Sequence, residues 1–327
     1  MNRLPSRSLF LLVALVFLAA WGCSSLKESS TTMPIKEYEK LIAGRLDADY
    51  VGTDSCVEKC HAHDRLTKDF RMSIHGGQVA AATGMPLVNC ESCHGPGSLA
   101  IENIQNDTCD FKTFIPISEI PAGAQSLVCL KCHSSFSLAN LSGWSSSRHA
   151  VGQVSCSDCH QIHKGPQQKV PRDDISDLCL GCHEEVAARL HLPSHHPVLE
   201  KKITCGDCHD PHGTSQDYNL KAASIKDLCV RCHADKKGPF VVEHGTTLTD
   251  DCTACHNPHG SINTAMTTYS QPFLCLQCHG GHAAPRRPIL QSDTVAKETF
   301  FGDCSACHGT HHGTDFPGWR PDGRLYR

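Results

Sequence analysis

Residues 205–213 read CGDCHDPHG, and close variants of this stretch recur along a chain of 327 residues. Nine pairs of cysteines stand three positions apart with a histidine directly after the second, giving the pattern C-x-x-C-H. A tenth pair, in CVEKCH at residues 56–61, has one more residue between its cysteines. The ten pairs use 20 of the 22 cysteines and leave Cys23 and Cys109. This repeated motif is therefore the feature on which the fold depends.

The pattern C-x-x-C-H is the attachment signature of c-type haem. Cysteines at i and i+3 lie on one face of a helical turn, where both sulfurs can bond the vinyl groups of one porphyrin edge. The histidine that follows lies one turn from the first cysteine and can bind the iron as proximal ligand. We therefore predict ten covalently attached haem c groups, each holding an iron. The predicted attachment cysteines are Cys56, Cys60, Cys90, Cys93, Cys129, Cys132, Cys156, Cys159, Cys179, Cys182, Cys205, Cys208, Cys229, Cys232, Cys252, Cys255, Cys275, Cys278, Cys304 and Cys307. The predicted proximal ligands are His61, His94, His133, His160, His183, His209, His233, His256, His279 and His308.

Zinc and disulfide bonds are the alternative uses of such cysteines. Zinc ribbons need two C-x-x-C pairs per metal and no histidine fixed after the second cysteine. A disulfide framework gives no reason to place histidine after every pair. In the longer first motif the cysteines stand at i and i+4, still on one helical face, with the histidine rotated relative to them. The repetition favours haem at all ten positions.

The other 13 of the 23 histidines also follow a pattern. We predict nine of them as distal ligands on the opposite face of an iron. Five stand three residues after a proximal histidine, namely His163, His212, His259, His282 and His311, and four lie in longer gaps, namely His75, His149, His196 and His244. A histidine so close in sequence to the proximal one cannot easily reach the other face of the same porphyrin, so we expect it to bind the haem of a neighbouring motif. The tenth distal ligand is left open among His63, His191, His195 and His312, and Cys109 is given no role.

This number of ligands favours electron transfer over catalysis. A haem that reduces a substrate needs an open iron position, whereas a haem between two histidines passes electrons with little change in ligation. All ten motifs end in histidine, and none has the lysine that marks the active haem of pentahaem nitrite reductases. We therefore predict an electron carrier with no catalytic residues.

The motifs recur at intervals of 23 to 39 residues, which indicates an array rather than a single globule. The expected fold is a multihaem cytochrome c, with short α-helices and loops around a linear haem array and almost no β-sheet. Helical periodicity is clearest over residues 36–46, 175–190 and 225–237. Because only 39% of the residues are apolar, cysteines included, the haems are expected to supply most of the core.

The N-terminus predicts export. Residues 1–22 read as a signal peptide, with Arg3 and Arg7 before an apolar stretch too short to span a bilayer. AAWGC resembles a lipobox, so we expect Cys23 to be lipidated and to contact the membrane; an ordinary signal-peptidase site near Gly22 is the alternative. Residues 23–51 then form a polar tether, residues 52–312 the decahaem domain, which could divide into two pentahaem-like halves, and residues 313–327 a tail. Ser24 favours the periplasmic face of the outer membrane over inner-membrane retention.

The order of motifs resembles a known family. The series CESCHGPGS, LVCLKCH, VSCSDCHQIH, CGDCHDPHG and DCTACHNPHGS is similar to the MtrA/PioA/DmsE-type decahaem c-type cytochromes of outer-membrane porin–cytochrome conduits, over about residues 52–312. The resemblance implies electron flow across the outer membrane inside a β-barrel porin. It also implies a periplasmic electron-donor cytochrome and an outer-surface multihaem cytochrome as partners. The long first motif and the lipobox depart from the family pattern.

Two other functions remain open at this point: a periplasmic electron shuttle or store without a porin and, less favoured, a multihaem reductase. The net charge of −4, to which each haem adds two propionates, excludes nucleic acid as a partner.

Overall fold

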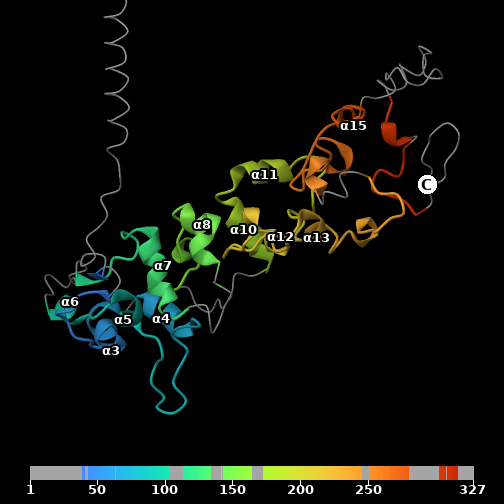
Figure 1. Cartoon of the computed structure of the whole chain (residues 1–327). Helices are drawn as coiled ribbons and strands as arrows, with labels where there is room; N and C mark the ends of the chain where they lie inside the picture. Colours follow the sequence, from blue (N-terminus) through green and yellow to red (C-terminus); the bar gives the residue numbers. More distant parts are fainter. Residues whose placement is uncertain are drawn as a thin grey trace, which may run out of the picture. The chain divides into compact units, whose positions relative to one another are not determined.

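The helices of this protein are short, and many of them carry haem motifs. The computed structural model describes residues 39–40, 43–62, 64–102, 113–133, 141, 143–163, 172–244, 251–279, 302–306 and 308–315. Over these residues the helices have three to nine residues, and isolated backbone bridges occur in place of β-strands (Figure 1). The predicted fold class is confirmed. The predicted signal peptide, Cys23, His63, Cys109, His282 and Cys307 lie outside the described residues.

The chain divides into two compact units, one of residues 1–62 with 89–120 and one of residues 63–88 with 121–327. In the first unit the helices are α3 (Thr53–Cys56), the π-helix η1 (Val57–His61), α5 (Cys90–His94) and α6 (Ser98–Glu102). In the second unit the α-helices are α4 (Arg65–Met72), α7 (Ala122–Leu130), α8 (Arg148–Val151), α9 (Cys156–Cys159), α10 (Arg172–Leu180), α11 (Glu184–Leu190), α12 (Cys205–Cys208), α13 (Ile225–Cys229) and α15 (Phe273–Leu276). Its 3₁₀-helices are η3 (Trp144–Ser146), η4 (Asp217–Asn219), η5 (Ala234–Lys236), η6 (Cys252–Ala254), η7 (Thr264–Met266) and η10 (Cys304–Ala306). None of these helices has the length and hydrophobicity that crossing a bilayer requires.

Two of the short motif helices, α9 and α12, are held by side chains at their N-termini. Thr204 precedes α12, and its backbone N–H donates to the carboxylate of Asp207 over 2.7 Å, which forms a capping box with the Thr204 hydroxyl. Ser155 and Asp158 form the same box on α9, also over 2.7 Å. Such caps satisfy backbone donors that a four-residue helix leaves without partners. The residues between and before the cysteines therefore stabilise the turn that presents them.

The predicted helices over 175–190 and 225–237 are each interrupted. His183 separates α10 from α11 with φ −93° and ψ 61°, and His233 stands between α13 and η5 with φ −98° and ψ 56°. These angles lie outside the helical region. The periodicity continues through the motif, but the chain turns at its histidine. The helix expected over 36–46 lies partly outside the described residues.

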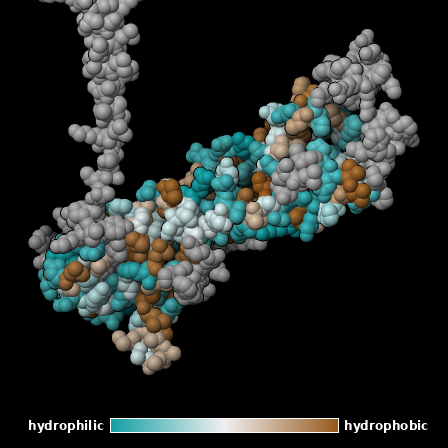
Figure 2. All heavy atoms as spheres, viewed as in Figure 1, coloured by the Kyte–Doolittle hydropathy of each residue, from teal (hydrophilic) through white to brown (hydrophobic). Residues whose placement is uncertain are grey.

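The apolar core is small. Among the described residues, few hydrophobic side chains are buried, and these include Trp144, Leu190 and Val198. A greater number of large hydrophobic side chains are exposed. Figure 2 shows hydrophobic residues scattered among hydrophilic ones on the visible face. A chain of this length would normally bury a larger apolar interior, so the protein side chains alone do not form its core.

In the first unit a buried carboxylate ties two motifs together. Glu91, in the second motif, is 2% exposed. It accepts hydrogen bonds from the backbone N–H groups of Val51 at 2.9 Å, Gly52 at 2.8 Å and Gly97 at 2.9 Å. Because a buried charge needs such partners, Glu91 fixes the start of α3, and with it Cys56, beside α5.

Candidate haem sites

Backbone hydrogen bonds set the geometry of the motifs. In eight of them, the third to the tenth, the N–H of the motif histidine donates to the carbonyl of the first cysteine over 2.8–3.1 Å. This i→i−4 bond places the histidine one helical turn from that cysteine. The ring and the first sulfur therefore lie on the same side of the turn, as the sequence analysis predicts for a proximal ligand.

Seven proximal histidines face a second histidine across a nearly constant gap. The ring centroids lie 5.8–6.2 Å apart in the pairs His75–His133, His149–His183, His160–His212, His196–His233, His209–His259, His244–His279 and His256–His312. A metal–imidazole bond is about 2 Å long and a ring nitrogen lies about 1 Å from the ring centre, so two imidazoles on one iron have centroids about 6 Å apart. The spacing therefore fits one iron between each pair of rings, and the residues present fit a haem with two histidine ligands.

The pairs follow a rule along the chain. Residues 156–183, 205–233 and 252–279 each hold two consecutive motifs, here called a motif pair. Each motif pair is preceded by a leading histidine, and the leading histidines His149, His196 and His244 face the second motif of their own pair.

A trailing histidine follows the first motif of a pair, or the tenth motif, which stands alone. The trailing histidines His212, His259 and His312 face the first motif of the preceding pair. Each motif pair therefore receives one distal histidine from the repeat that follows it.

At the last repeat the structure differs from the sequence analysis. The ring opposite His256 belongs to His312 at 6.1 Å, whereas His311, the residue predicted from its spacing, contacts His312 at 4.4 Å. His312 precedes Gly313, as His212 precedes Gly213, and both glycines have positive φ, 114° and 103°. The equivalent position is thus the histidine before this glycine, because CHGTHHG has one residue more than CHDPHG. We accordingly replace His311 by His312 as the proposed distal ligand.

The leading histidines are oriented by carbonyl groups of the next repeat. His149 Nδ1 lies 2.9 Å from the Pro211 oxygen, and His196 Nδ1 lies 2.7 Å from the Pro258 oxygen. A carbonyl oxygen can only accept, so Nδ1 carries the proton and Nε2 remains available to a metal. Each proline directly precedes a trailing histidine, so the sequence Pro-His-Gly orients one distal ligand and supplies another.

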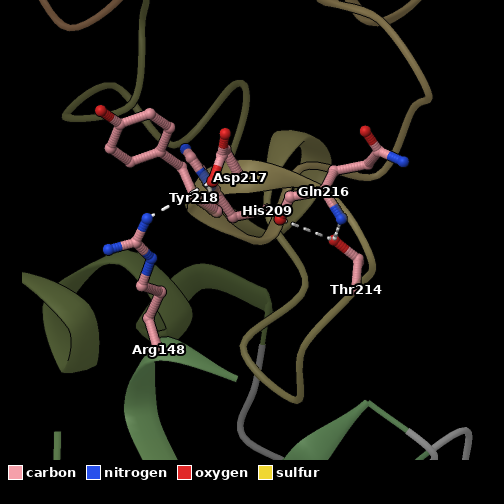
Figure 3. Close-up of polar contacts among 6 residues, drawn as sticks. All are labelled: Arg148, His209, Thr214, Gln216, Asp217 and Tyr218. Carbon is pink, nitrogen blue, oxygen red and sulfur yellow. Dashed lines mark hydrogen bonds and ion pairs between the residues drawn. The ribbon is translucent and has the colours of Figure 1, made fainter. Parts of the chain in front are cut away.

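Two proximal histidines are oriented by strained turns. His209 Nδ1 lies 2.8 Å from the Tyr218 oxygen, and His256 Nδ1 lies 2.8 Å from the Ala265 oxygen. Tyr218 and Ala265 have φ of 55° and 54°, in the left-handed region that costs a non-glycine residue about 1–3 kcal/mol. Arg148, which bonds Asp217 at 3.4 Å, lies over the Tyr218 ring, as Figure 3 shows. Sequence reasoning missed these orienting carbonyls, because the residues that carry them have no distinctive side chain.

Burial keeps several of the facing rings neutral. It lowers the pKa of His75, His160, His244, His259 and His312, in the last case to about 4. Neutral imidazole is the form that binds a metal. These rings are therefore in the ligating form at neutral pH.

Two of the four histidines left open lie at or near the end of α11. His195 lies 2.6 Å from the Leu192 oxygen through Nδ1 and 3.1 Å from Glu200 through Nε2, so both ring nitrogens have protein partners. His191 ends α11 as its C-cap residue. Neither faces a motif histidine in the ring pairs above. His61, His94, His163 and His308 make further contacts, and their assignment as ligands rests on the sequence.

Cysteines of consecutive motifs lie near enough to one another to interact electrostatically. First cysteines interact in the pairs Cys56–Cys90, Cys129–Cys156, Cys179–Cys205, Cys229–Cys252 and Cys275–Cys304. Second cysteines interact in the pairs Cys159–Cys182, Cys208–Cys232 and Cys255–Cys278. In the second unit the two kinds alternate without a break from the third motif to the tenth. Since each cysteine marks the edge of a porphyrin, the chain brings successive haem edges together.

The first motif differs in one respect. Cys60 is disulfide-bonded, whereas the other motif cysteines among the described residues form no disulfide. The expectation that Cys60 holds a haem does not fit this arrangement, because a sulfur in a disulfide has no hydrogen to add to a vinyl group.

The fold and these sites define a multihaem c-type cytochrome. The family described as the doubled CXXCH motif matches residues 149–188, 195–238 and 244–284, so each match begins at or next to a leading histidine and spans one motif pair. The chain is also 34% identical over 272 residues to "Multiheme cytochrome MtrA" of Shewanella baltica (strain OS185), covering 81% of this chain and 79% of the relative. This chain belongs to the MtrA family of multihaem cytochromes, and it is an electron carrier that binds haem c through its C-x-x-C-H motifs.

Proposed function

We propose that this protein carries electrons across the outer membrane, through an array of ten haems enclosed in a β-barrel porin. Its donor would be a periplasmic cytochrome, and its acceptor an outer-surface multihaem cytochrome or an extracellular substrate. The observation that supports the proposal is the unbroken alternation of interacting first and second cysteines from the third motif to the tenth. A series of adjacent haem edges suits transport along a line better than storage at separate sites.

The side chains of the protein have two tasks in this function. The haem iron, when bound, supplies the one-electron chemistry. The two facing histidines of each of the seven ring pairs would hold the iron from both sides and so exclude substrates from it. The Nδ1–carbonyl hydrogen bonds of His149, His196, His209 and His256 hold the rings in place, so that little ligand movement is needed when the charge on the iron changes.

The porin follows from the physics of the bilayer. A hydrocarbon core is about 30 Å thick. A backbone built of loops and short helices would expose unsatisfied amides to lipid, each costing several kcal/mol. A wide β-barrel with a polar lumen provides the enclosure that such a chain needs.

The N-terminus would hold the protein at the periplasmic face of the outer membrane. We propose that Cys23 becomes the lipidated first residue after removal of residues 1–22, followed by the polar tether. Mass spectrometry of the N-terminal peptide should find two or three acyl chains. A soluble wild-type protein without lipid would contradict this anchor.

Liposomes loaded with a redox dye test the conduit. Barrel and cytochrome together should let external dithionite reduce the dye, whereas barrel alone should not. The matched control is Cys205→Ala/Cys208→Ala, which removes one haem from the middle of the series and should slow dye reduction while the barrel still binds. Equal rates with the control would indicate leakage rather than conduction. If outer-membrane pull-downs recover no barrel and the dye stays oxidised, the protein is a periplasmic shuttle.

A further inference from the structure

The first motif accommodates its extra residue through a π-helical turn. CVEKCH continues from α3 into the π-helix η1, Val57–His61. A π-turn closes i→i+5 hydrogen bonds and so holds one residue more than an α-turn. Cys56 and His61, five positions apart, can therefore lie on one side of the turn, as the first cysteine and the histidine do in the shorter motifs. The inserted residue therefore still allows the first motif to hold a haem.

Cys56 lies where the first cysteines of other motifs lie. It is 8% exposed and hydrogen-bonds Cys90, the first cysteine of the next motif, just as Cys129 bonds Cys156 and Cys179 bonds Cys205. Glu91 holds the preceding backbone beside α5, through the hydrogen bonds from Val51 and Gly52 described above. This sulfur is thus positioned as an attachment cysteine.

Cys60 is placed differently, because its sulfur is already in a disulfide. A thioether forms when a thiol S–H adds across a vinyl double bond, with the sulfur bonding one carbon and the hydrogen going to the other. A disulfide sulfur carries no hydrogen and cannot react in this way. The two fates of Cys60 exclude each other, and the nine regular motifs show no such conflict among their described cysteines.

We propose that the first haem is held by a single thioether, from Cys56, and that Cys60 forms a structural disulfide in place of the second thioether. Thioether formation at Cys56 transfers no electrons. Disulfide formation removes two protons and two electrons from two thiols, and a protein disulfide of the exported compartment accepts them as it becomes a dithiol. One vinyl group of this haem stays unsaturated. The proposal is independent of the porin, so the liposome experiment and the one below can fail separately.

The sequence offers a direct test. Trypsin cleaves after Lys59 and so separates CVEK, which ends residues 46–59, from CHAHDR at residues 60–65. Full-length holoprotein is alkylated without reduction, digested and weighed. We expect haem on the Cys56 peptide alone and the Cys60 peptide in a disulfide that reduction releases. A second digest, with trypsin and a glutamate-specific protease, cleaves after Glu102 and Lys112 and frees peptide 103–112. This peptide is sought first as the disulfide partner, because it carries Cys109, which no motif uses. Both peptides joined through one haem, before and after reduction, would overturn the proposal, as would an alkylated Cys60.

Two variants give a second measurement. Cys60→Ala should keep the number of haems unchanged, whereas Cys56→Ala should lose one. The pyridine adduct of the reduced protein should also show a small red-shifted component from the haem with a free vinyl group, in wild type and in Cys60→Ala alike. Loss of a haem in Cys60→Ala, or a spectrum of fully saturated haems in the wild type, would refute attachment through one cysteine.

Discussion

Gly213 is the position where a single methyl group should open one iron. It follows the trailing histidine His212 and has φ +103°, a conformation that residues with a Cβ rarely adopt. A Cβ there would lie 2.4 Å from the Gly143 oxygen and 2.7 Å from the Ser147 Cβ. Ser147 is fully buried, so neither neighbour can withdraw easily. In Gly213→Ala the loop must shift, and His212 must shift with it.

The size of the effect follows from two terms. A left-handed conformation costs a residue with a Cβ about 1–2 kcal/mol. Overpacking a tight contact costs about 1–3 kcal/mol. If both are relieved when His212 leaves the iron, the balance between bound and unbound histidine shifts by about 2–5 kcal/mol, which is about 30-fold to 4,000-fold at 1.4 kcal/mol per factor of ten.

Carbon monoxide binding to the reduced protein measures the open iron, since it needs a free axial position. Gly213→Ala should bind about one equivalent per chain and show a high-spin ferric signal from the haem of the fourth motif, with attachment intact. Gly123→Ala is the matched control, because a Cβ there meets nothing within 4 Å. A variant that remains low-spin and binds no more carbon monoxide than the control would show that Gly213 does not position His212.

Two further predictions concern histidines whose roles the structure separates. His312→Ala should open the iron opposite it and raise carbon monoxide binding by one equivalent, while His311→Ala should not; the reverse result would restore the ligand expected from sequence spacing. The backbone carbonyl of Leu192 and then Glu200 raise the pKa of His195, so its protonated form stabilises the fold below the ordinary histidine pKa of about 6.5. This stabilisation should be lost as the pH rises through the raised pKa, so the melting temperature of the wild type should fall over that range. In His195→Asn the fall should be smaller. Parallel plots of melting temperature against pH for variant and wild type would contradict this role of His195.

Contacts within one motif could be predicted from the sequence, whereas contacts between repeats could be predicted only in part. Attachment cysteines and proximal histidines stand within one helical turn, so their spacing is set by covalent geometry and reads directly from the chain. Six predicted distal histidines, including His149 and His212, indeed face a proximal ring. Their pairing is a property of neighbouring repeats in space, and at the last repeat the ring that faces His256 belongs to His312, one residue after the histidine predicted from spacing.

Other features carried little or no signal in the sequence. The glycine after each trailing histidine is required by close packing. At Gly260 a Cβ would lie 2.1 Å from the Arg189 oxygen, and at Gly313 it would lie 2.4 Å from the Phe240 side chain. Read as His-Gly, this signal would have selected His312. The carbonyls of Tyr218 and Ala265 depend on backbone conformation alone, which unrelated side chains can adopt. The disulfide of Cys60 depends on a choice between two covalent fates that the spacing of its motif does not decide.

The pairing rule makes a prediction about fragments. A chain that ends after Leu190 keeps five motifs and the pair His149–His183, but it loses His212 and should leave the iron at His160 open. A chain that ends after Glu243 keeps seven motifs, regains His212 and should instead open the iron at His209, whose partner is His259.

Each cut should therefore create one carbon monoxide site beyond those of the full chain, and the site should move along the protein with the cut. The reason is that the ligand for the second haem of a motif pair is the leading histidine directly before that pair, whereas the ligand for its first haem comes from the next repeat. Magnetic circular dichroism, with carbon monoxide titration of both fragments and the full chain, counts these sites. Fragments with no additional open iron would mean that each repeat saturates its own haems, and several additional ones would mean that the fold had collapsed beyond the cut. One site in each fragment would make the trailing histidines the links that hold successive repeats in register.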